Sequence, residues 1–420
     1  MIGKKVYVLG GTQSDFQRNF TKEGKIYTAV IKELLDDGLR QAGIDDDMLE
    51  MAKKDNKVAC CVGNFIAENY AEQGHLGPLI TEAGSRYYDI PTARYENACA
   101  SGSVALDNAI SRIRLGDYDL VIVLGWEIMK TVSSVVGGDY IGKAAIFEKE
   151  AKGQEFPFPK LFSALADTFI EKYKLDEARY MDNIACIAAN NYENARRNPN
   201  AQTRNWFMDL ETAKNRGTKA NPIVGGRLAI SDCSQITDGG AVVVLASEDF
   251  IKKYLKDDIK EFPIVKGFGH RTAPMSFDKK IAYSLNSEYV LPLTRQAIVD
   301  AYNRAELTVN DIDVFETHDC FSSSEYAAIS AFGLTEPGKE YEAIEDGRIF
   351  FDGNRPINPS GGLIGGGHPI GGTGVRMFLD LYKQVTATAG GYQVKNVRNA
   401  AMLNIGGSGT TNYSFIVGKQ

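Results

Sequence analysis

The two halves of this 420-residue sequence show the same order of predicted strands and helices, and this repetition constrains the fold most strongly. In the first half, two apolar runs of strand length flank a stretch whose apolar residues recur at helical spacing: Val6–Leu9, Thr28–Ala42 and Val58–Val62. The second half repeats this order: Phe262–Val265, Leu293–Ala305 and Ile312–Phe315. Such alternation predicts an α/β protein with largely buried sheets.

Each half then has a glycine-containing turn that leads into another predicted helix. The turn Ala98–Ser103 precedes Val104–Leu115, and the turn Gly365–Pro369 precedes Gly374–Val385. Both halves close on two strand patterns: Val121–Leu124 and Ala241–Leu245 in the first, Ala401–Ile405 and Tyr413–Val417 in the second. Because a chain of this length exceeds one ordinary core, we expect two fused, pseudo-twofold halves with chemistry where they meet.

A polar segment, residues 127–228, interrupts the repeat and has no counterpart in the second half. Within residues 191–230, three acidic residues accompany seven basic ones: Arg196, Arg197, Arg204, Lys214, Arg216, Lys219 and Arg227. The whole chain has a formal net charge of −7, so this is a local reversal of sign. Two interpretations stay open: a solvated insertion, or a clamp for a ligand that carries phosphates.

Composition and charge exclude several classes of protein. A net charge of −7 argues against a nucleic-acid-binding protein, which needs a basic face. No apolar run approaches the ~18–20 residues of a membrane span, and the N-terminal residues lack the apolar stretch of a signal peptide. The six cysteines form no CxxC pair, which favours reduced thiols over a disulfide framework. We expect a cytoplasmic protein without membrane or nucleic-acid partners.

Cys99 is the leading candidate nucleophile. It lies in the small-residue turn Ala98-Cys99-Ala100-Ser101-Gly102, just before a predicted helix. The N-terminus of a helix stabilises a thiolate and lowers the pKa of the thiol. The alternative is a small buried apolar side chain, which is what most free cysteines are.

His368 is the leading candidate base. It lies in Gly-Gly-Gly-His-Pro-Ile-Gly-Gly-Thr-Gly, in a chain with only four histidines. Dense glycines allow close approach of the backbone to a ligand or to another side chain. An imidazole beside a thiol is the minimum needed to activate that thiol as a nucleophile. The alternative is a histidine that caps a turn.

A second histidine and a second cysteine follow the strand Ile312–Phe315, as His318 and Cys320. Two Cys/His pairs could bind a metal, but the paired CxxC or HxxxH spacing is missing, so we expect no metal site. The glycine runs do not match GxGxxG after a strand, which makes a dinucleotide site a weak alternative.

Taken together, three ordered motifs resemble those of the thiolase superfamily across almost the whole chain. Asn97–Gly102 is similar to the family's nucleophile motif, Gly367–Gly371 to its GHPxG motif, and Ser231–Ala241 to the return into the first half. The resemblance implies the thiolase fold, with two βαβαβ-type halves in five α-β-α-β-α layers and an inserted loop domain for coenzyme A. The implied divisions are residues 1–126 with 229–255, residues 127–228, and residues 256–420.

Two departures narrow the resemblance. The chain has His318-Asp319-Cys320-Phe321 where the common thiolases carry Asn-Glu-Ala-Phe, and this form resembles the sterol-carrier-protein-2 type. It has Asn404-Ile405-Gly406-Gly407-Ser408 where they carry Cys-x-Gly-Gly-Gly, so the usual second catalytic cysteine is missing there. No segment resembles an attached sterol-carrier domain, and we expect the thiolase part alone.

The resemblance implies an enzyme that makes or cleaves the carbon–carbon bond of a 3-oxoacyl-CoA through an acyl-Cys99 intermediate. His368 is then the base for Cys99, Cys320 the acid/base at the α-carbon, and His318 a donor to the enolate oxygen, with the backbone N–H groups of Cys99 and Gly406 as the other oxyanion site. Coenzyme A or acetyl-CoA would be a substrate rather than a tightly bound cofactor. The seven basic residues of the insertion are candidates for its phosphates.

Alternatives stay open at this point. Within the superfamily, the chain could be a condensing enzyme or an acyltransferase with a carrier-protein or non-acetyl acceptor. From another class, it could be a catalytically silent scaffold subunit, against which the full set of candidate residues counts. The resemblance also implies a homodimer or tetramer, and a small zinc-ribbon/OB-fold partner protein.

Overall fold

The structure is a computed structural model that describes residues 3–420. It contains a nine-stranded mixed sheet in the order β3-β2-β4-β7-β1-β8-β11-β10-β9. The first half of the chain supplies β1 (Tyr7–Gln13), β2 (Val58–Gly63), β3 (Thr92–Tyr95), β4 (Leu120–Glu127) and β7 (Gly239–Ala246). The second half supplies β8 (Ile264–Thr272), β9 (Val314–Thr317), β10 (Asn399–Gly406) and β11 (Thr411–Gly418).

The sheet consists of two half-sheets with the same topology. The order β2-β4-β7-β1 in the first half matches β9-β10-β11-β8 in the second. In both, one parallel pair of strands is followed by antiparallel pairs. The half-sheets join where Tyr7 of β1 pairs with Ile264 of β8. The predicted repeat is confirmed, and the first half has one unexpected extra strand, the edge strand β3.

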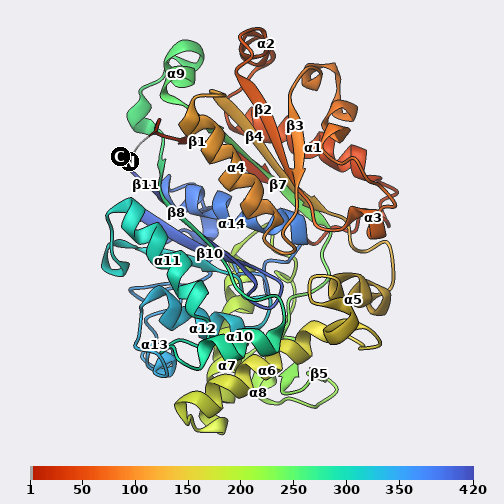
Figure 1. Cartoon of the computed structure of the whole chain (residues 1–420), viewed down its shortest axis with the longest axis vertical. Coiled ribbons are helices and arrows are strands. Elements are labelled where there is room, and N and C mark those ends of the chain that lie inside the picture. The colour runs from red at the N-terminus through yellow and green to blue at the C-terminus, as the bar shows by residue number, and fades with distance from the viewer. Residues whose placement is uncertain (1–2) are drawn as a thin grey trace.

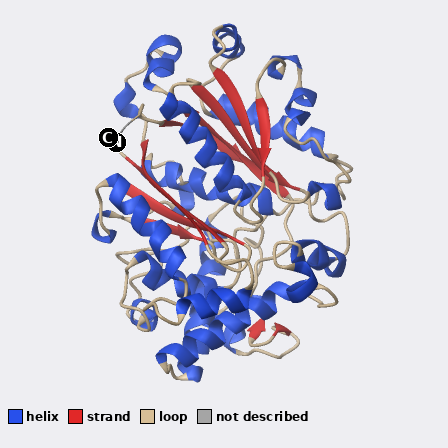
Figure 2. Cartoon of the chain, in the orientation of Figure 1, coloured by secondary structure: helices blue, strands red, loops and turns tan. Residues whose placement is uncertain are grey.

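Helices form three of the five layers. The middle layer holds α4 (Ser101–Leu115) and α14 (Ile370–Val385), which pack on each other; α14 contacts strands of both half-sheets. The outer helices are α1 (Tyr27–Gln41), which covers β1 and β7, and α11 (Pro292–Ala305), which covers β8 and β11 (Figure 1). Figure 2 shows the strands as two groups with helices between them. The expected arrangement of two like halves in five α-β-α-β-α layers is confirmed.

A large insertion separates β4 from β7. It contains α5 (Ser134–Gly142), α6 (Pro157–Tyr173), α7 (Glu177–Arg197), α8 (Leu210–Lys214) and the hairpin β5 (Ile223–Gly225) and β6 (Leu228–Ala229). In the second half, the corresponding strands β10 and β11 are joined by the turn 407–410 alone. The remaining helices are α2 (Asp46–Lys54), α3 (Ala67–Tyr70), α9 (Glu248–Phe250), α10 (Phe277–Ser284), α12 (Ser322–Phe332) and α13 (Glu340–Glu345).

The start of α14 differs from the prediction for a physical reason. The sequence pattern predicted a helix that begins at Gly374, because glycines weaken a helix. The observed helix begins at Ile370 and includes Gly371 and Gly372. A Cβ at Gly371 would lie 2.6 Å from the Cα of Asn64, so only glycine lets the helix pack this close to the first half. Tertiary packing overrides local propensity here.

Between residues 3 and 420, no helix has both the length and the apolar character needed to cross a membrane.

Candidate active site

The Cys99 turn is held by contacts within its own sequence. Ala98 adopts a left-handed conformation with φ +52°, which is strained for a residue with a Cβ. The hydroxyl of Ser101 accepts a hydrogen bond from the N–H of Asn97 (3.0 Å) and donates one to the carbonyl of Ala98 (2.6 Å). The N–H of Ala98 donates to the Glu96 carboxylate (2.6 Å). These bonds place Cys99 directly before α4, as predicted.

The His368 ring is held so that its other nitrogen can accept a proton. Thr373 donates its hydroxyl proton to the carbonyl of Pro369 (2.9 Å), and the same oxygen lies 2.7 Å from His368 Nδ1. Because that hydroxyl has only one proton, the network assigns the ring proton to Nδ1. Nε2 of His368 therefore keeps a free lone pair, as a base for the Cys99 thiol requires.

His318 is held in the opposite tautomer by Asn404, which the sequence analysis did not predict as a site residue. The Asn404 amide oxygen accepts from Ser103 Oγ (2.7 Å), and its nitrogen donates to His318 Nδ1 (2.9 Å) and to the Cys99 carbonyl (3.3 Å). His318 Nδ1 is then an acceptor, so Nε2 carries the proton. That Nε2 is buried and has no hydrogen-bond partner among the described residues, and His318 itself does not line the cavity at Cys99.

The two halves bring these groups together. The sulfur of Cys99 and one ring nitrogen each of His318 and His368 lie within 4.8 Å of one another. The two imidazole rings meet edge to face, with centroids 5.1 Å apart. Close packing of α4 on α14 makes this possible, since a Cβ at Gly102 would lie 2.9 Å from the Gly371 carbonyl oxygen. Three such donors could also hold a metal ion, so the expectation of a metal-free site stays a prediction.

A cavity of about 350 Å³ opens onto this cluster. Cys99, Cys320, Cys233, His368 and Gly407 line it, together with apolar residues that include Met129, Ile141, Phe156, Phe158, Ile236 and Phe321. Cys320 precedes the fully buried helix α12. The expected oxyanion donor Gly406 ends β10 and does not line the cavity, whereas its neighbour Gly407 does. The N–H groups of Gly407 and Cys99 both lie where they stabilise a thiolate at Cys99. The oxyanion role of Gly406 stays a prediction.

Burial moves the titration of every group in this cluster away from neutral pH. It raises the pKa of Cys99 to about 12, although the N–H groups of Gly407 and Cys99 act in the other direction. Burial lowers the pKa of His368 to about 3, holds the pKa of His318 well below its ordinary value, and raises the pKa of Cys320 well above it. The expectation of a lowered Cys99 pKa was therefore wrong, because desolvation outweighs the stabilising N–H groups at the start of the helix.

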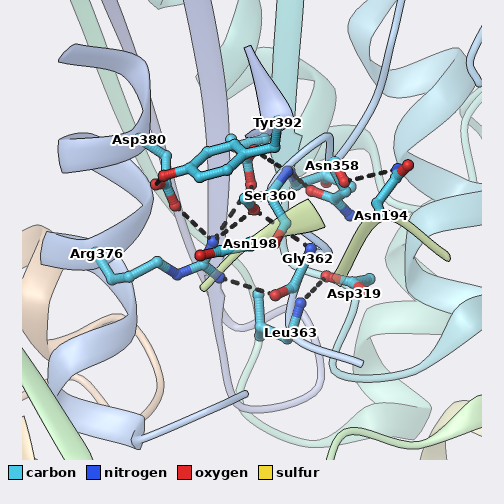
Figure 3. Close-up of polar contacts among 12 residues, drawn as sticks. Asn194, Asn198, Asp319, Asn358, Ser360, Gly362, Leu363, Arg376, Asp380 and Tyr392 are labelled. Atoms are coloured by element: carbon cyan, nitrogen blue, oxygen red, sulfur yellow. Dashed lines mark hydrogen bonds and ion pairs between the residues drawn. The ribbon is translucent and has the colours of Figure 1, made fainter. Parts of the chain in front are cut away.

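A buried polar network fixes the loop before His368, as Figure 3 shows. Asp319 accepts hydrogen bonds from the N–H groups of Leu363 (2.6 Å) and Ile364 (3.1 Å). Residue 362 must be glycine, with φ +59°, because a Cβ there would lie 2.4 Å from the Asp319 carboxylate. Asn198, the residue after α7, donates to the carbonyl of Ser360 (2.9 Å). Asp319 thus ties the turn that carries His318 and Cys320 to the loop that carries His368.

Glu127, at the end of β4, makes the corresponding link from the first half. Its buried carboxylate accepts from the N–H groups of Phe65 (2.9 Å), Ile66 (3.2 Å) and Gly371 (3.0 Å). Burial raises the pKa of Glu127 to about 7. The sequence signal that could have identified it is an acidic residue that closes the apolar run 120–126. The carboxylate anchors the start of α14, and with it the His368 turn.

None of the seven basic residues of the insertion lines the cavity at Cys99. Four of them face carboxylates: Arg204 faces Asp15, Lys214 faces Asp182, Arg216 faces Asp232, and Arg227 faces Asp167 and Glu177. Arg196 and Arg197 both lie near Glu193, and Lys219 is exposed. Arg216 makes two bonds of 3.0 Å to the buried Asp232, which is adjacent to the cavity residue Cys233. Their role at CoA phosphates stays a prediction.

Fold and site together define a class of protein: an α/β protein of two like halves, with a cysteine and two histidines buried at their junction. The family model for the thiolase N-terminal domain matches residues 21–249, and that for the thiolase C-terminal domain-like region matches residues 279–419. The chain belongs to the thiolase family.

Similar proteins agree with this assignment. The chain is 32% identical over 393 residues to the acetyl-CoA acetyltransferase of Methanothermobacter thermautotrophicus, covering 93% of this chain and 95% of that protein. It is 28% identical to rabbit (Oryctolagus cuniculus) sterol carrier protein 2, covering 96% of this chain and 70% of that protein. A solved structure described as the Ltp2-ChsH2(DUF35) aldolase has a TM-score of 0.78 at 15% identity, covering 100% of this chain and 99% of that one. This last likeness shows the fold alone.

Proposed function

We propose that this thiolase-family acyltransferase makes or cleaves the carbon–carbon bond of a 3-oxoacyl-CoA through an acyl-Cys99 intermediate. One observation carries the proposal: a thiol and two imidazoles within 4.8 Å, with a second reactive thiol, Cys320, on the same cavity. A base beside a thiol activates it, and a second acid/base group can serve the carbon that gains or loses a proton.

In the cleavage direction, His368 Nε2 takes the Cys99 proton as the sulfur attacks the 3-oxo carbonyl carbon. The bond between this carbon and the α-carbon then breaks, and its electron pair passes to the α-carbon of the leaving acetyl-CoA enolate. The Cys320 thiol gives that carbon its proton. A molecule of CoA then attacks the acyl-Cys99 thioester and gives its thiol proton to the Cys320 thiolate. His368 returns its proton to the Cys99 sulfur as the acyl group leaves. Synthesis is the reverse.

Two sets of donors serve the oxygens that become negative. His318 Nε2–H lies ready for the enolate oxygen, since Asn404 holds its tautomer. The N–H groups of Gly407 and Cys99 serve the oxygen on the carbon attacked by the sulfur. Preorganised donors of this kind typically contribute about 3–4 kcal/mol each to transition-state stabilisation. A neutral resting thiol fits this route, because the proton moves only when substrate arrives.

The acyl-enzyme can be tested by mass spectrometry. Incubation with a panel of 3-oxoacyl-CoAs should leave an acyl adduct on Cys99, and the Cys99→Ser variant should carry none. Cys233→Ser is the matched control, because this cysteine lines the same cavity. It should still form the adduct on Cys99. An adduct on another cysteine, or none in the wild type with any substrate, contradicts the proposal.

The role of Cys320 can be separated from acylation. The Cys320→Ala variant should still acquire the acyl group on Cys99, but should exchange the α-protons of acetyl-CoA with deuterated water at least about a hundredfold more slowly. Exchange at the wild-type rate in this variant would show that another group moves the α-proton.

We also propose that the chain divides into residues 1–126 with 229–255, residues 127–228, and residues 256–420, and that the segment 127–228 is the loop domain that holds CoA. This is supported by Ile141, Phe156 and Phe158 of that segment, which line the cavity at Cys99. Its basic side chains are the candidates for the CoA phosphates. Arg196 and Arg197, which share the exposed Glu193, and the exposed Lys219 are preferred over Arg216, which pairs with the buried Asp232. Replacement of these three by Met should raise the KM for acetyl-CoA and leave kcat within about twofold. An unchanged KM contradicts the assignment.

We further propose a cytoplasmic homo-oligomer that works with a small zinc-ribbon/OB-fold protein. The location is supported by six cysteines that are all free thiols, which suits a reducing compartment. The partner is supported by the name of the Ltp2-ChsH2(DUF35) aldolase, which describes an assembly of two proteins. Light scattering on the purified chain tests the oligomer, and affinity purification from its own host with mass spectrometry tests the partner.

A further inference from the structure

Lys280 is a buried lysine outside the site described so far. It lies on α10, and only 4% of its surface is exposed. Its ammonium nitrogen donates to Ser408 Oγ (2.8 Å), Thr410 Oγ1 (2.7 Å) and the carbonyl of Met275 (3.2 Å). Each of its three protons therefore has an acceptor. Among residues 3–420, no carboxylate forms an ion pair with it, which makes its burial costly and calls for a reason.

Two of these acceptors belong to the turn 407–410, which presents Gly407 to the catalytic cysteine. The turn contains two glycines in left-handed conformations, Gly407 (φ +63°) and Gly409 (φ +86°). Glycine gives a turn many alternative conformations, so its geometry must be fixed from outside. A Cβ at Gly407 would lie 2.8 Å from the Ala144 carbonyl oxygen, so the turn packs closely against the inserted segment at a position where only glycine fits.

We propose that Lys280 is a positioning residue that clamps the turn 407–410, so that the Gly407 N–H faces Cys99 and the oxygen of the reacting carbonyl. The proposal rests on the proposed function, because it assigns a support to its oxyanion site. Ser408 occupies the position where the common thiolase pattern has a third glycine. Its hydroxyl is one of the two hydroxyl groups that accept a hydrogen bond from Lys280. The clamp therefore uses a side chain that this pattern lacks.

The clamp is expected to depend on pH. Burial lowers the pKa of Lys280 to about 8, and the nearby charge of Glu150 acts in the other direction. Tyr283 is the other titratable residue that lines the small cavity beside Lys280. Above about pH 8 the amine loses one proton and one of its three hydrogen bonds. The turn should then loosen, and catalysis should fall with an apparent pKa near 8.

The test compares Lys280→Met with Lys266→Met. Lys266 on β8 is also partly buried, and its nitrogen donates to Asn399, at the opposite end of β10 from the turn. The first readout is the rate at which iodoacetamide alkylates Cys99, measured by mass, since this needs no substrate. Lys280→Met should slow alkylation about tenfold relative to wild type, and Lys266→Met should not change it. Equal rates in the two variants overturn the proposal.

The second readout is steady-state thiolysis. Lys280→Met should lower kcat about tenfold, leave KM within about twofold, and remove the fall in kcat near pH 8 that the wild type shows. Loss of kcat with the pH dependence retained overturns the clamp. If the wild type thiolyses no 3-oxoacyl-CoA, the proposed function fails while the alkylation rates still decide the role of Lys280.

Two milder variants guard against misfolding of Lys280→Met. Ser408→Ala and Thr410→Val each remove one acceptor and keep the lysine. Each should slow alkylation of Cys99 about two- to threefold, and the double variant should approach the tenfold effect. Wild-type alkylation rates in both single variants and in the double variant overturn the proposal.

Discussion

The turns before α4 and α14 occupy equivalent places in the two halves, yet they are stabilised in different ways. The Cys99 turn is fixed by neighbours in sequence, chiefly Ser101. The His368 turn is fixed by distant residues. The Thr237 hydroxyl accepts a hydrogen bond from the N–H of His368 (2.8 Å), and the Glu127 carboxylate accepts one from the N–H of Gly371. The nucleophile turn thus takes most of its support from nearby residues, with one bond of 3.3 Å from the distant Asn404 to the Cys99 carbonyl. The His368 turn depends much more on residues elsewhere in the fold.

The comparison also explains why both groups rest in their neutral forms. The same burial raises the pKa of Cys99 and lowers the pKa of His368, because it disfavours whichever form is charged. The site therefore stores a thiol and a free base side by side rather than an ion pair. The four predictions below test this division of labour between the halves.

The largest effect is expected from removal of the base. His368→Ala should lower kcat/KM for thiolysis about a thousandfold, because general-base catalysis contributes about 10²–10⁴ in rate. Thr373→Val, which frees the tautomer but keeps the ring, should cost only about tenfold. Stopped-flow acylation of Cys99 measures both. A His368→Ala rate within tenfold of the wild type would assign the base elsewhere.

Asn404→Leu should come next, with a loss of about a hundredfold in kcat. Without the amide, nothing holds His318 as an Nε2–H donor, and one oxyanion donor is typically worth about 10²–10³ in rate. Asn183→Leu is the matched control, since Asn183 is buried on α7 and its amide donates to the Arg179 carbonyl and to Glu345 rather than to a histidine. If both variants lose activity equally, the effect is structural, and the tautomer argument is wrong.

Arg216→Met should affect stability rather than CoA binding. It leaves the buried Asp232 without its cation, which typically lowers the free energy of unfolding by about 3–5 kcal/mol. Because Arg216 is partly exposed, we expect a loss of about 3 kcal/mol, at the lower end of this range. The KM for acetyl-CoA should change by less than about twofold. Urea unfolding and steady-state kinetics test these two statements, and a large rise in KM at unchanged stability would return Arg216 to the CoA site.

The smallest effect, counted per pH unit, is a slope of stability with pH. Below pH 6.5 the unfolded chain protonates its histidines, while folded His368 stays neutral down to about pH 3. The folded state should therefore lose about 1.4 kcal/mol per pH unit from this residue as pH falls from 6.5 towards 3. In His368→Gln the slope should be shallower by that amount. Equal slopes in urea titrations at several pH values would contradict the buried neutral imidazole.

The sequence predicted the fold well because repetition and periodicity are local properties. The strands Val58–Val62 and Ala401–Ile405 and the helix Leu293–Ala305 lie within the observed β2, β10 and α11. The edge strand β3 was missed, since its four half-buried residues show no clear alternation. The start of α14 was misplaced because its glycines serve packing rather than helix propensity.

The sequence by itself determined which residues could do chemistry: Cys99, His318, Cys320 and His368 stand in recognisable motifs. Only the tertiary structure decided how they work, because protonation depends on burial and on partners far away in the chain. It set the tautomers of both histidines through Thr373 and Asn404, kept the thiol neutral, and placed Gly407 beside Cys99 on the wall of the cavity. Motifs record residue types, whereas electrostatics and hydrogen bonds arise only once the two halves are packed together.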